Sequence, residues 1–135
     1  MKKEYWILII IAVIIIGWLG VRFIIGESED SWIKDDKGEY VEHGAPSETP
    51  DYVSEQQTAI IQARELYFQK RQQGMNFESQ CLGSVGDEVK YAVDIVHVPR
   101  TSEDNKPENQ CSDFRTGKVQ HFIELDKEGN IFQIV

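Results

Sequence analysis

The stretch EVKYAVDIVHVP, residues 88–99, decides the fold class of this chain. It is rich in β-branched residues, which favour the pleated surface of a sheet, and Pro99 ends it because proline cannot donate to a strand ladder. Side chains alternate between the two faces of a strand, so His97 shares one face with Tyr91, while Asp94 lies on the other. The stretch therefore predicts a β-strand that runs directly into a hydrophilic loop.

A helix is expected before this strand, over residues 54–73. Ser54 and Gln57 have the spacing of a capping box, and Gly74 supplies a C-terminal stop. Apolar residues recur at helical spacing between these ends and form one stripe: Ala59, Ile60, Ala63, Leu66 and Tyr67. The segment predicts an amphipathic helix that buries this stripe.

Further strands are expected on both sides of residues 88–99. NFESQCLG (76–83) is a short candidate, whereas KVQHFIELD (118–126) and NIFQIV (130–135) flank a turn in which Gly129 suits the left-handed position. One helix and three or four such strands predict an α+β fold, with the helix packed on a three- to four-stranded antiparallel sheet.

The N-terminus carries a long apolar run. Residues 5–21, YWILIIIAVIIIGWLGV, form 17 consecutive positions without a charge. A helix over residues 5–25 is about 31 Å long at ~1.5 Å per residue, which is enough to cross the hydrocarbon core of a bilayer. Arg22 lies near one end, where its side chain can reach the headgroups. The run predicts a transmembrane helix at 5–25 after a cytoplasmic stub at 1–4.

Two alternatives to an uncleaved anchor stay open. A cleavable secretory signal has a shorter apolar region, about 7–15 residues, and a small-residue cut site that residues 17–28 supply only poorly. A helix buried in a protein core is the other alternative. Lys2 and Lys3 flank the start of the run, and positive flanks stay in the cytoplasm. We therefore expect a single-pass protein of the cell membrane, with a cytoplasmic N-terminus and an extracytoplasmic C-terminal domain.

The charge balance excludes some classes of partner. The chain has 23 acidic and 14 basic residues, and one acidic and three basic residues precede residue 27. Residues 27–135 therefore carry 22 acidic and 11 basic residues, a net charge of −11. Such a domain lacks the basic surface that binds nucleic acid or anionic lipid headgroups. The expected partners are the membrane, through the N-terminal helix, and a protein.

Residues 26–53 predict an acidic tether between the anchor and the domain. Two β-prone pieces, Ser31–Lys34 and Glu39–Val41, surround a turn and predict a small hairpin. This hairpin must pack on something or fray, because an isolated hairpin is marginally stable in water. The prolines of APSETP (45–50) prevent the anchor helix from continuing into the domain, which is expected at 54–135.

Cys81 and Cys111 are the only cysteines, so a single pairing exists. In an oxidising compartment outside the cytoplasm, a disulfide is the expected state of such a pair. Closing a loop of about 31 residues stabilises a fold by roughly 3–4 kcal/mol through the entropy lost by the unfolded chain.

The segment from residue 97 to residue 111 is the candidate functional stretch. Its expected structure is a strand end and a surface loop that Cys111 ties back to the fold. The polar side chains of this loop are the candidates for contacts with a partner: His97, Arg100, Asp104, Asn105, Glu108 and Asn109.

Metal and catalytic sites are the alternatives for this region. A zinc site would use the two cysteines with His97 and His121, but their spacing lacks the close ligand pairs of structural zinc sites. The acidic loop offers oxygens to calcium without the spacing or the glycine of an EF-hand. Hydrolysis needs an activated nucleophile that the sequence lacks, and a carboxylate pair such as Asp94 with Glu124 is too common to be diagnostic. We expect no metal, no cofactor and no enzymatic activity.

Two parts of the chain resemble uncharacterised single-pass membrane proteins of candidate-phylum bacteria and small archaea. EDSWIKDDKGEYVEHGAPS (29–47) resembles their juxtamembrane segment, although Lys34 stands where a cysteine is common. The matching positions are Trp32, Gly38, Tyr40, His43, Gly44, Pro46 and Ser47. CLGSVGDEVKYAVDIVHVPR (81–100), together with DNKPENQC and HFIELDKEGNI further on, resembles their globular part. The order of elements is also similar to a PepSY or cystatin-like unit, which implies a role in binding or inhibition.

These observations predict a membrane-anchored, extracytoplasmic module that binds a protein at the cell surface. The alternative is a structural subunit of a surface filament or membrane complex, with a pilin-like layout. Pilin stems continue as one long helix beyond the membrane, and the prolines at residues 46 and 50 oppose that continuation.

Overall fold

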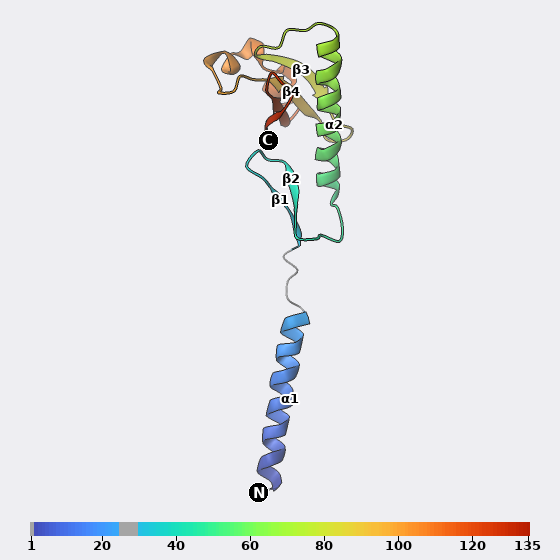
Figure 1. Cartoon of the computed structure of the whole chain (residues 1–135), viewed down its shortest axis with the longest axis vertical. Coiled ribbons are helices and arrows are strands. Elements are labelled where there is room, and N and C mark those ends of the chain that lie inside the picture. Colours follow the sequence, from blue (N-terminus) through green and yellow to red (C-terminus); the bar gives the residue numbers. More distant parts are fainter. Residues whose placement is uncertain (1, 25–29) are drawn as a thin grey trace.

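The structure is a computed structural model that describes residues 2–24 and 30–135, with side chains described at 5–18 and 30–135 (Figure 1). The longer elements in chain order are α1 (Lys2–Ile24), β1 (Ser31–Lys34), β2 (Tyr40–His43), α2 (Asp51–Gln72), β3 (Gln80–Val85), β4 (Tyr91–Ile95), β5 (His121–Leu125) and β6 (Ile131–Ile134). Three short helical turns lie between β4 and β5: η1 (Ser102–Asn105), η2 (Pro107–Asn109) and α3 (Ser112–Arg115).

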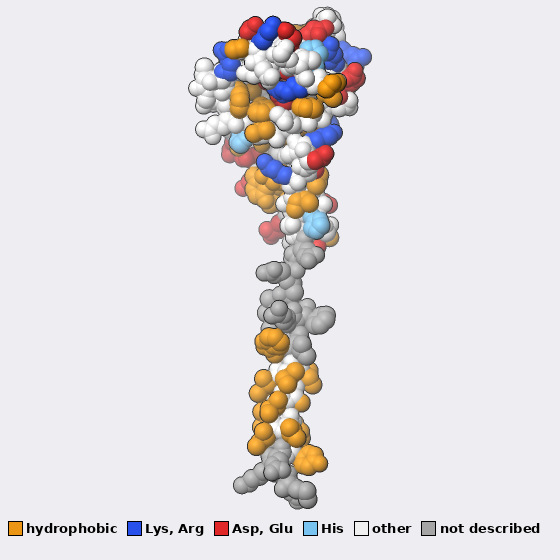
Figure 2. Space-filling model, turned by 90° about the vertical axis from the view of Figure 1, so that its left-hand side faces the viewer, with side chains coloured by type: hydrophobic (Ala, Val, Ile, Leu, Met, Phe, Trp, Pro, Cys, Tyr) orange, Lys and Arg blue, Asp and Glu red, His pale blue; other side chains and the backbone are white. Residues whose placement is uncertain are grey.

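The apolar N-terminal run forms α1, which stands apart from the sheet and from α2 in Figure 1. Hydrophobic side chains cover the described part of this helix on the side that Figure 2 shows. In the part of the chain that the structure describes, no helix is both long and apolar enough to cross a membrane. The predicted end of the span at residue 25, and the start of the tether at 26, lie outside the described residues.

The main sheet has four strands in the order β3-β4-β5-β6, so the predicted α+β fold is confirmed. The two outer pairs are antiparallel, but β4 and β5 run parallel. The prediction of a wholly antiparallel sheet is therefore wrong. β4 and β5 can run parallel because the connection over residues 96–120 is long. It is long enough to bring the chain back along the sheet, so that β5 starts at the same end as β4.

One face of the sheet packs on α2. The buried side chains of this face join those of the helix in one hydrophobic core, whose largest fully buried members are Ile95, Ile123 and Leu125. The helix begins at Asp51, directly after Pro50, and not at the predicted capping box. Proline is well suited to the start of a helix, because its missing N–H would have no partner there.

The segment 102–119 covers the other face of the sheet. Ala92 of β4, Cys111 and Val119 form a second, smaller core, with Phe114 and Phe122 packed against it. β4 is therefore buried on both faces, and every one of its five residues is buried. A strand that is covered on both faces has apolar residues at successive positions and not at every second one. This explains why YAVDIV shows little polar alternation.

The small hairpin β1–β2 lies within the range predicted as a tether and packs against α2. Buried Gln56 of α2 accepts a hydrogen bond from the Tyr40 N–H (2.8 Å) and donates one to the Gly38 carbonyl (2.9 Å). The turn also meets β6, because the Ile134 N–H donates to the Lys37 carbonyl at 2.7 Å. These bonds supply the support that an isolated hairpin lacks.

Candidate functional site

The site lies where β4 leaves the sheet. β4 ends at Ile95, so the strand predicted to run to Pro99 is too long. A cis peptide bond joins Val98 to Pro99 in the turn that follows. His97 consequently belongs to this turn and not to a strand face.

The Asp104 carboxylate stabilises the turn through hydrogen bonds. Its side chain is fully buried and accepts hydrogen bonds from the backbone N–H groups of His97 (3.0 Å) and Thr101 (2.7 Å). The Thr101 hydroxyl adds a third bond at 3.1 Å, and Thr101 and Asp104 form a reciprocal capping box around η1. The carboxylate thus fixes the positions of both ends of the turn.

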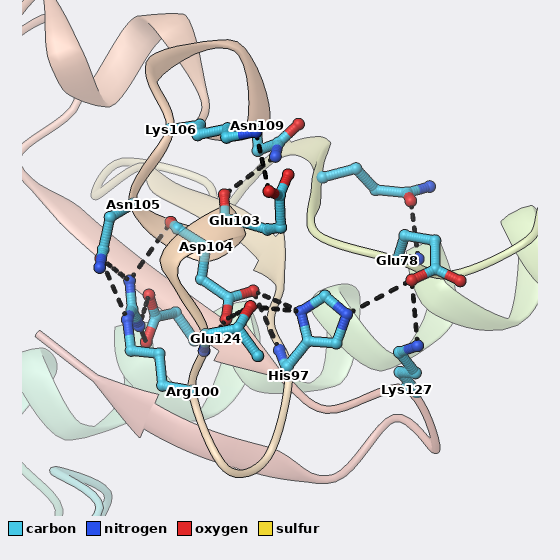
Figure 3. Close-up of polar contacts among 12 residues, drawn as sticks. Glu78, His97, Arg100, Glu103, Asp104, Asn105, Lys106, Asn109, Glu124 and Lys127 are labelled. Carbon is cyan, nitrogen blue, oxygen red and sulfur yellow. Dashed lines mark hydrogen bonds and ion pairs between the residues drawn. The ribbon is translucent and has the colours of Figure 1, made fainter.

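The His97 ring lies between two carboxylates (Figure 3). Nδ1 is 3.0 Å from Asp104 Oδ1, and Nε2 is 3.3 Å from Glu78 Oε2. Lys127 contacts the same oxygen of Glu78 at 3.1 Å. One network of polar contacts therefore joins three parts of the fold: the segment before β3, the turn after β4 and the β5–β6 turn.

Opposing effects set the pKa of the Asp104 carboxyl. Burial alone raises it, but the backbone N–H groups of Thr101 and His97, the His97 ring and Ser79 favour the charged form. Together these bonds hold the pKa of Asp104 well below its usual range. The pKa of Glu78 is also lowered, first by its hydrogen bond with Lys127 and then by that with His97.

Arg100 forms an ion pair with Glu124 of β5. Its Nη1 lies 2.7 and 2.8 Å from the two carboxylate oxygens, and the Glu124 side chain is buried. The Asn105 side-chain oxygen accepts two further bonds from the guanidinium group at 3.3 Å each. A buried carboxylate requires such partners because its desolvation is costly.

Asp94 and the disulfide lie next to the Arg100–Glu124 ion pair. Cys81 and Cys111 are joined, with a Cα–Cα distance of 4.8 Å, as the cysteine count predicts. Asp94 lies between Cys81 and Glu124 in the strand register, so the three residues form a row across β3, β4 and β5. Asp94 Oδ1 is buried and has no hydrogen-bond partner among the described residues.

The pKa of Asp94 is raised to about 6. Burial is the main cause, and the charge of Glu124 adds to it. The backbone N–H of Cys111 and the Arg100 charge act in the opposite direction without cancelling the rise. Two aspartates within ten residues of each other thus have opposite shifts, because one is surrounded by donors and the other is not.

The six residues predicted as a binding loop fall into two groups. His97, Arg100, Asp104 and Asn105 come together, and their polar atoms contact one another or neighbouring parts of the fold. The other two lie on η2: Asn109 donates to the Glu103 carbonyl, and Glu108 is exposed. Contact of this loop with a partner stays a prediction.

Sequence reasoning missed three members of the cluster. Glu78 and Lys127 come from segments 49 residues apart, so no local pattern indicates that they meet. Thr101 is different, because Thr-x-x-Asp from 101 to 104 has the spacing of a capping box. That spacing could have identified the start of η1 and the anchoring role of Asp104.

A group of metal-ligand types occurs at the disulfide. Single ligand atoms of Cys81, Asp94 and Cys111 lie within 4.8 Å of one another. Both sulfurs are bonded to each other, so they are not available as the thiolates that zinc requires. His121, the other candidate ligand, lies beside the Tyr91 ring at a centroid distance of 5.1 Å.

A shallow hollow of about 340 Å³ lies between the outer side of α2 and the β5–β6 turn. Arg64, Tyr67 and Phe68 line it from the helix, and residues 128–131 line it from the turn. Tyr67 is buried and donates its hydroxyl to the Lys127 carbonyl at 2.8 Å, which fixes the floor of the hollow. Phe68 remains 57% exposed beside it.

Comparisons with protein families, with curated proteins and with solved structures returned no match.

Proposed function

We propose that the chain is a membrane-anchored, extracytoplasmic binding module whose partner is a protein. The observation that carries this proposal is a strip on the outer side of α2, in which two exposed apolar side chains flank the exposed Arg64 and Glu65. Ile61 and Phe68 are 58% and 57% exposed and lie two helical turns apart on one side of the helix. Arg64 is exposed between them and borders the same hollow as Phe68.

The composition of this strip suits a protein partner. Aromatic residues and arginine are enriched in protein interfaces: aromatic side chains bury a large area at a small cost in conformational entropy, and the arginine fork donates several hydrogen bonds. The hollow beside Phe68 can receive a side chain of the partner, and its rim carries charges of both signs at Lys37, Glu39 and Glu128. A polar rim around an apolar centre is the usual arrangement of an interface.

The membrane anchor rests on α1. The described part of this helix exposes large apolar side chains on all sides: Tyr5, Trp6, Ile7, Leu8, Ile9, Ile10, Ile11, Val13, Ile14, Ile15, Ile16 and Trp18. A helix that is apolar all round requires an apolar environment, and a lipid bilayer is the one we propose. The two lysines before the run favour a cytoplasmic N-terminus.

Cross-linking and capture from native membranes tests the proposal. The full-length tagged chain is compared with Phe68→Ser, with Ile61→Ser and with Ile33→Ser, a control whose side chain is 44% exposed on β1. We expect Phe68→Ser to lower capture of the partner about tenfold or more, since central apolar contacts contribute more than ~1.4 kcal/mol. Equal capture by Phe68→Ser and Ile33→Ser would exclude this strip as the binding surface. Cross-links only between α1 helices of two copies would favour the filament subunit instead.

A further inference from the structure

The two cysteines of the disulfide differ sharply in their exposure. Cys81 lies on β3, an edge strand of the sheet, and is exposed. Cys111 is 2% exposed beneath the segment that covers the sheet. A thiolate arriving from solvent therefore meets Cys81 first, whereas Cys111 is shielded.

A buried carboxyl group adjoins both sulfurs. A carboxylate oxygen of Asp94 lies within 4.8 Å of each Sγ, and Asp94 is only 8% exposed. Its Oδ1 has no hydrogen-bond partner among the described residues, so this oxygen is free to carry a proton. The charged groups that act on it are Glu124 from β5 and Arg100 from the turn, which are already paired with each other.

The surroundings of Cys111 also suit a thiol. Its Sγ lies 3.6 Å from the Gly83 carbonyl oxygen and 3.5 Å from the Val93 carbonyl oxygen. In the disulfide the sulfur has no hydrogen to donate, but a reduced and protonated Cys111 can donate to either carbonyl. Burial beside the Asp94 carboxyl disfavours its thiolate, so Cys111 leaves more readily when it receives a proton.

We propose that Cys81–Cys111 is a thiol–disulfide exchange site, in which a partner dithiol attacks Cys81 and Asp94 supplies a proton to the departing Cys111. The disulfide is then chemically active as well as stabilising. This inference is independent of the proposed binding surface on α2.

The exchange takes two steps, in which bonds, protons and electrons balance. The first thiolate of the partner attacks Cys81 Sγ, the Cys81–Cys111 bond breaks, and Cys111 leaves with the electron pair and takes the proton from Asp94. The second thiolate of the partner then attacks the partner's own sulfur in the mixed disulfide and releases Cys81 as a thiolate, which takes a proton from water. The partner dithiol is oxidised to a disulfide by two electrons, and the two cysteines are reduced. Asp94 recovers its proton from water.

Reduction of the full-length folded chain by dithiothreitol tests the role of Cys81. An exchange site reacts in the folded state, so its rate rises in proportion to thiolate concentration. A disulfide that only stabilises the fold is reduced after the chain opens, so its rate reaches a plateau at the opening rate. The Cys111→Ser variant should form a mixed disulfide at Cys81 with an added aromatic disulfide, and Cys81→Ser should react far more slowly at the buried Cys111. A plateau, or equal reactivity of the two variants, would overturn the proposal.

The pH dependence tests the role of Asp94. Burial raises the pKa of Asp94 to about 6, so the acid is present at pH 5.5 and largely absent at pH 8. At pH 5.5 the rate constant per thiolate should be about 100-fold higher for the natural chain than for Asp94→Asn, the lower end of the range for general acid catalysis. The two rates should converge at pH 8. Asp113→Asn, a change at a carboxyl group of α3, is the control and should follow the natural chain. Identical profiles for Asp94→Asn and the natural chain would contradict the proton transfer.

Discussion

Replacement of Asp104 by asparagine should destabilise the fold by about 3 kcal/mol at pH 7. The side chain is fully buried, and its two oxygens accept bonds from the His97 and Thr101 backbone N–H groups, the Thr101 hydroxyl and the His97 ring. Asparagine keeps the shape, but its NH₂ group replaces one of the two oxygens. This NH₂ group then faces the two donors that the replaced oxygen accepted bonds from. A buried N–H without an acceptor costs about 1–3 kcal/mol, and the loss of bonds to a charged group adds to that cost.

The effect should depend on pH in a defined direction. The folded-state pKa of Asp104 is lowered, so the unfolded chain binds the proton first as the pH falls. The contribution of the carboxylate is therefore fully present above the unfolded pKa of about 3.9 and is lost as the pH falls through the folded pKa. At pH 3 the difference between the natural chain and Asp104→Asn should be smaller by about 1 kcal/mol than at pH 7.

Urea unfolding of the detergent-solubilised full-length chain, followed by near-ultraviolet circular dichroism, measures both quantities. Asp113→Asn is the control, because Asp113 is partly exposed and forms only a long ion pair of 3.6 Å with Lys118. It should change the free energy of unfolding by less than about 0.5 kcal/mol. The reasoning fails if Asp104→Asn is as stable as this control at pH 7, or if its deficit is the same at pH 3.

Three further predictions concern stability. The folded pKa of Asp94 is raised to about 6, so its protonated form favours folding below pH 4 and this contribution is lost as the pH rises through 6. Asp94→Asn should therefore be about 2–3 kcal/mol more stable than the natural chain at pH 8 and equal to it at pH 4, as measured by urea unfolding. Reduction of Cys81–Cys111 should cost roughly 3–4 kcal/mol and lower the melting temperature by many degrees, and an unchanged melting temperature would argue against the clamp. Gln56→Ala should remove both hydrogen bonds to the hairpin turn, and hydrogen exchange at the Tyr40 amide should then become faster.

The elements with strong local signals were predictable from the sequence. The β5–β6 hairpin follows from its turn, in which Gly129 has φ of 88° and packs directly against the Tyr67 ring. The α2 helix follows from its apolar stripe, although its start at Asp51 was missed because Ser54 offered a capping pattern inside the helix. Local patterns identify an element well but place its ends less securely.

Strand direction was not predictable from the same signals. Alternation identifies a strand without giving its direction, and only the 25-residue connection between Ile95 and His121 indicated a crossover. The disulfide was predictable because only two cysteines exist. The polar cluster was only half predictable, because Glu78 and Lys127 reach His97 through the tertiary fold.

Protease treatment of intact cells tests whether the chain is a membrane-anchored module on the outer surface. The chain carries one epitope tag at its N-terminus and a second after Val135, and the exposed residues at 47–49 offer a cleavage region before α2. We predict that protease releases the C-terminal tag into the medium, while the N-terminal tag remains protected in the membrane fraction. Full protection of both tags in intact cells, with cleavage only after lysis, would contradict this topology. A mature chain that begins near residue 27 would show a cleaved signal in place of an anchor.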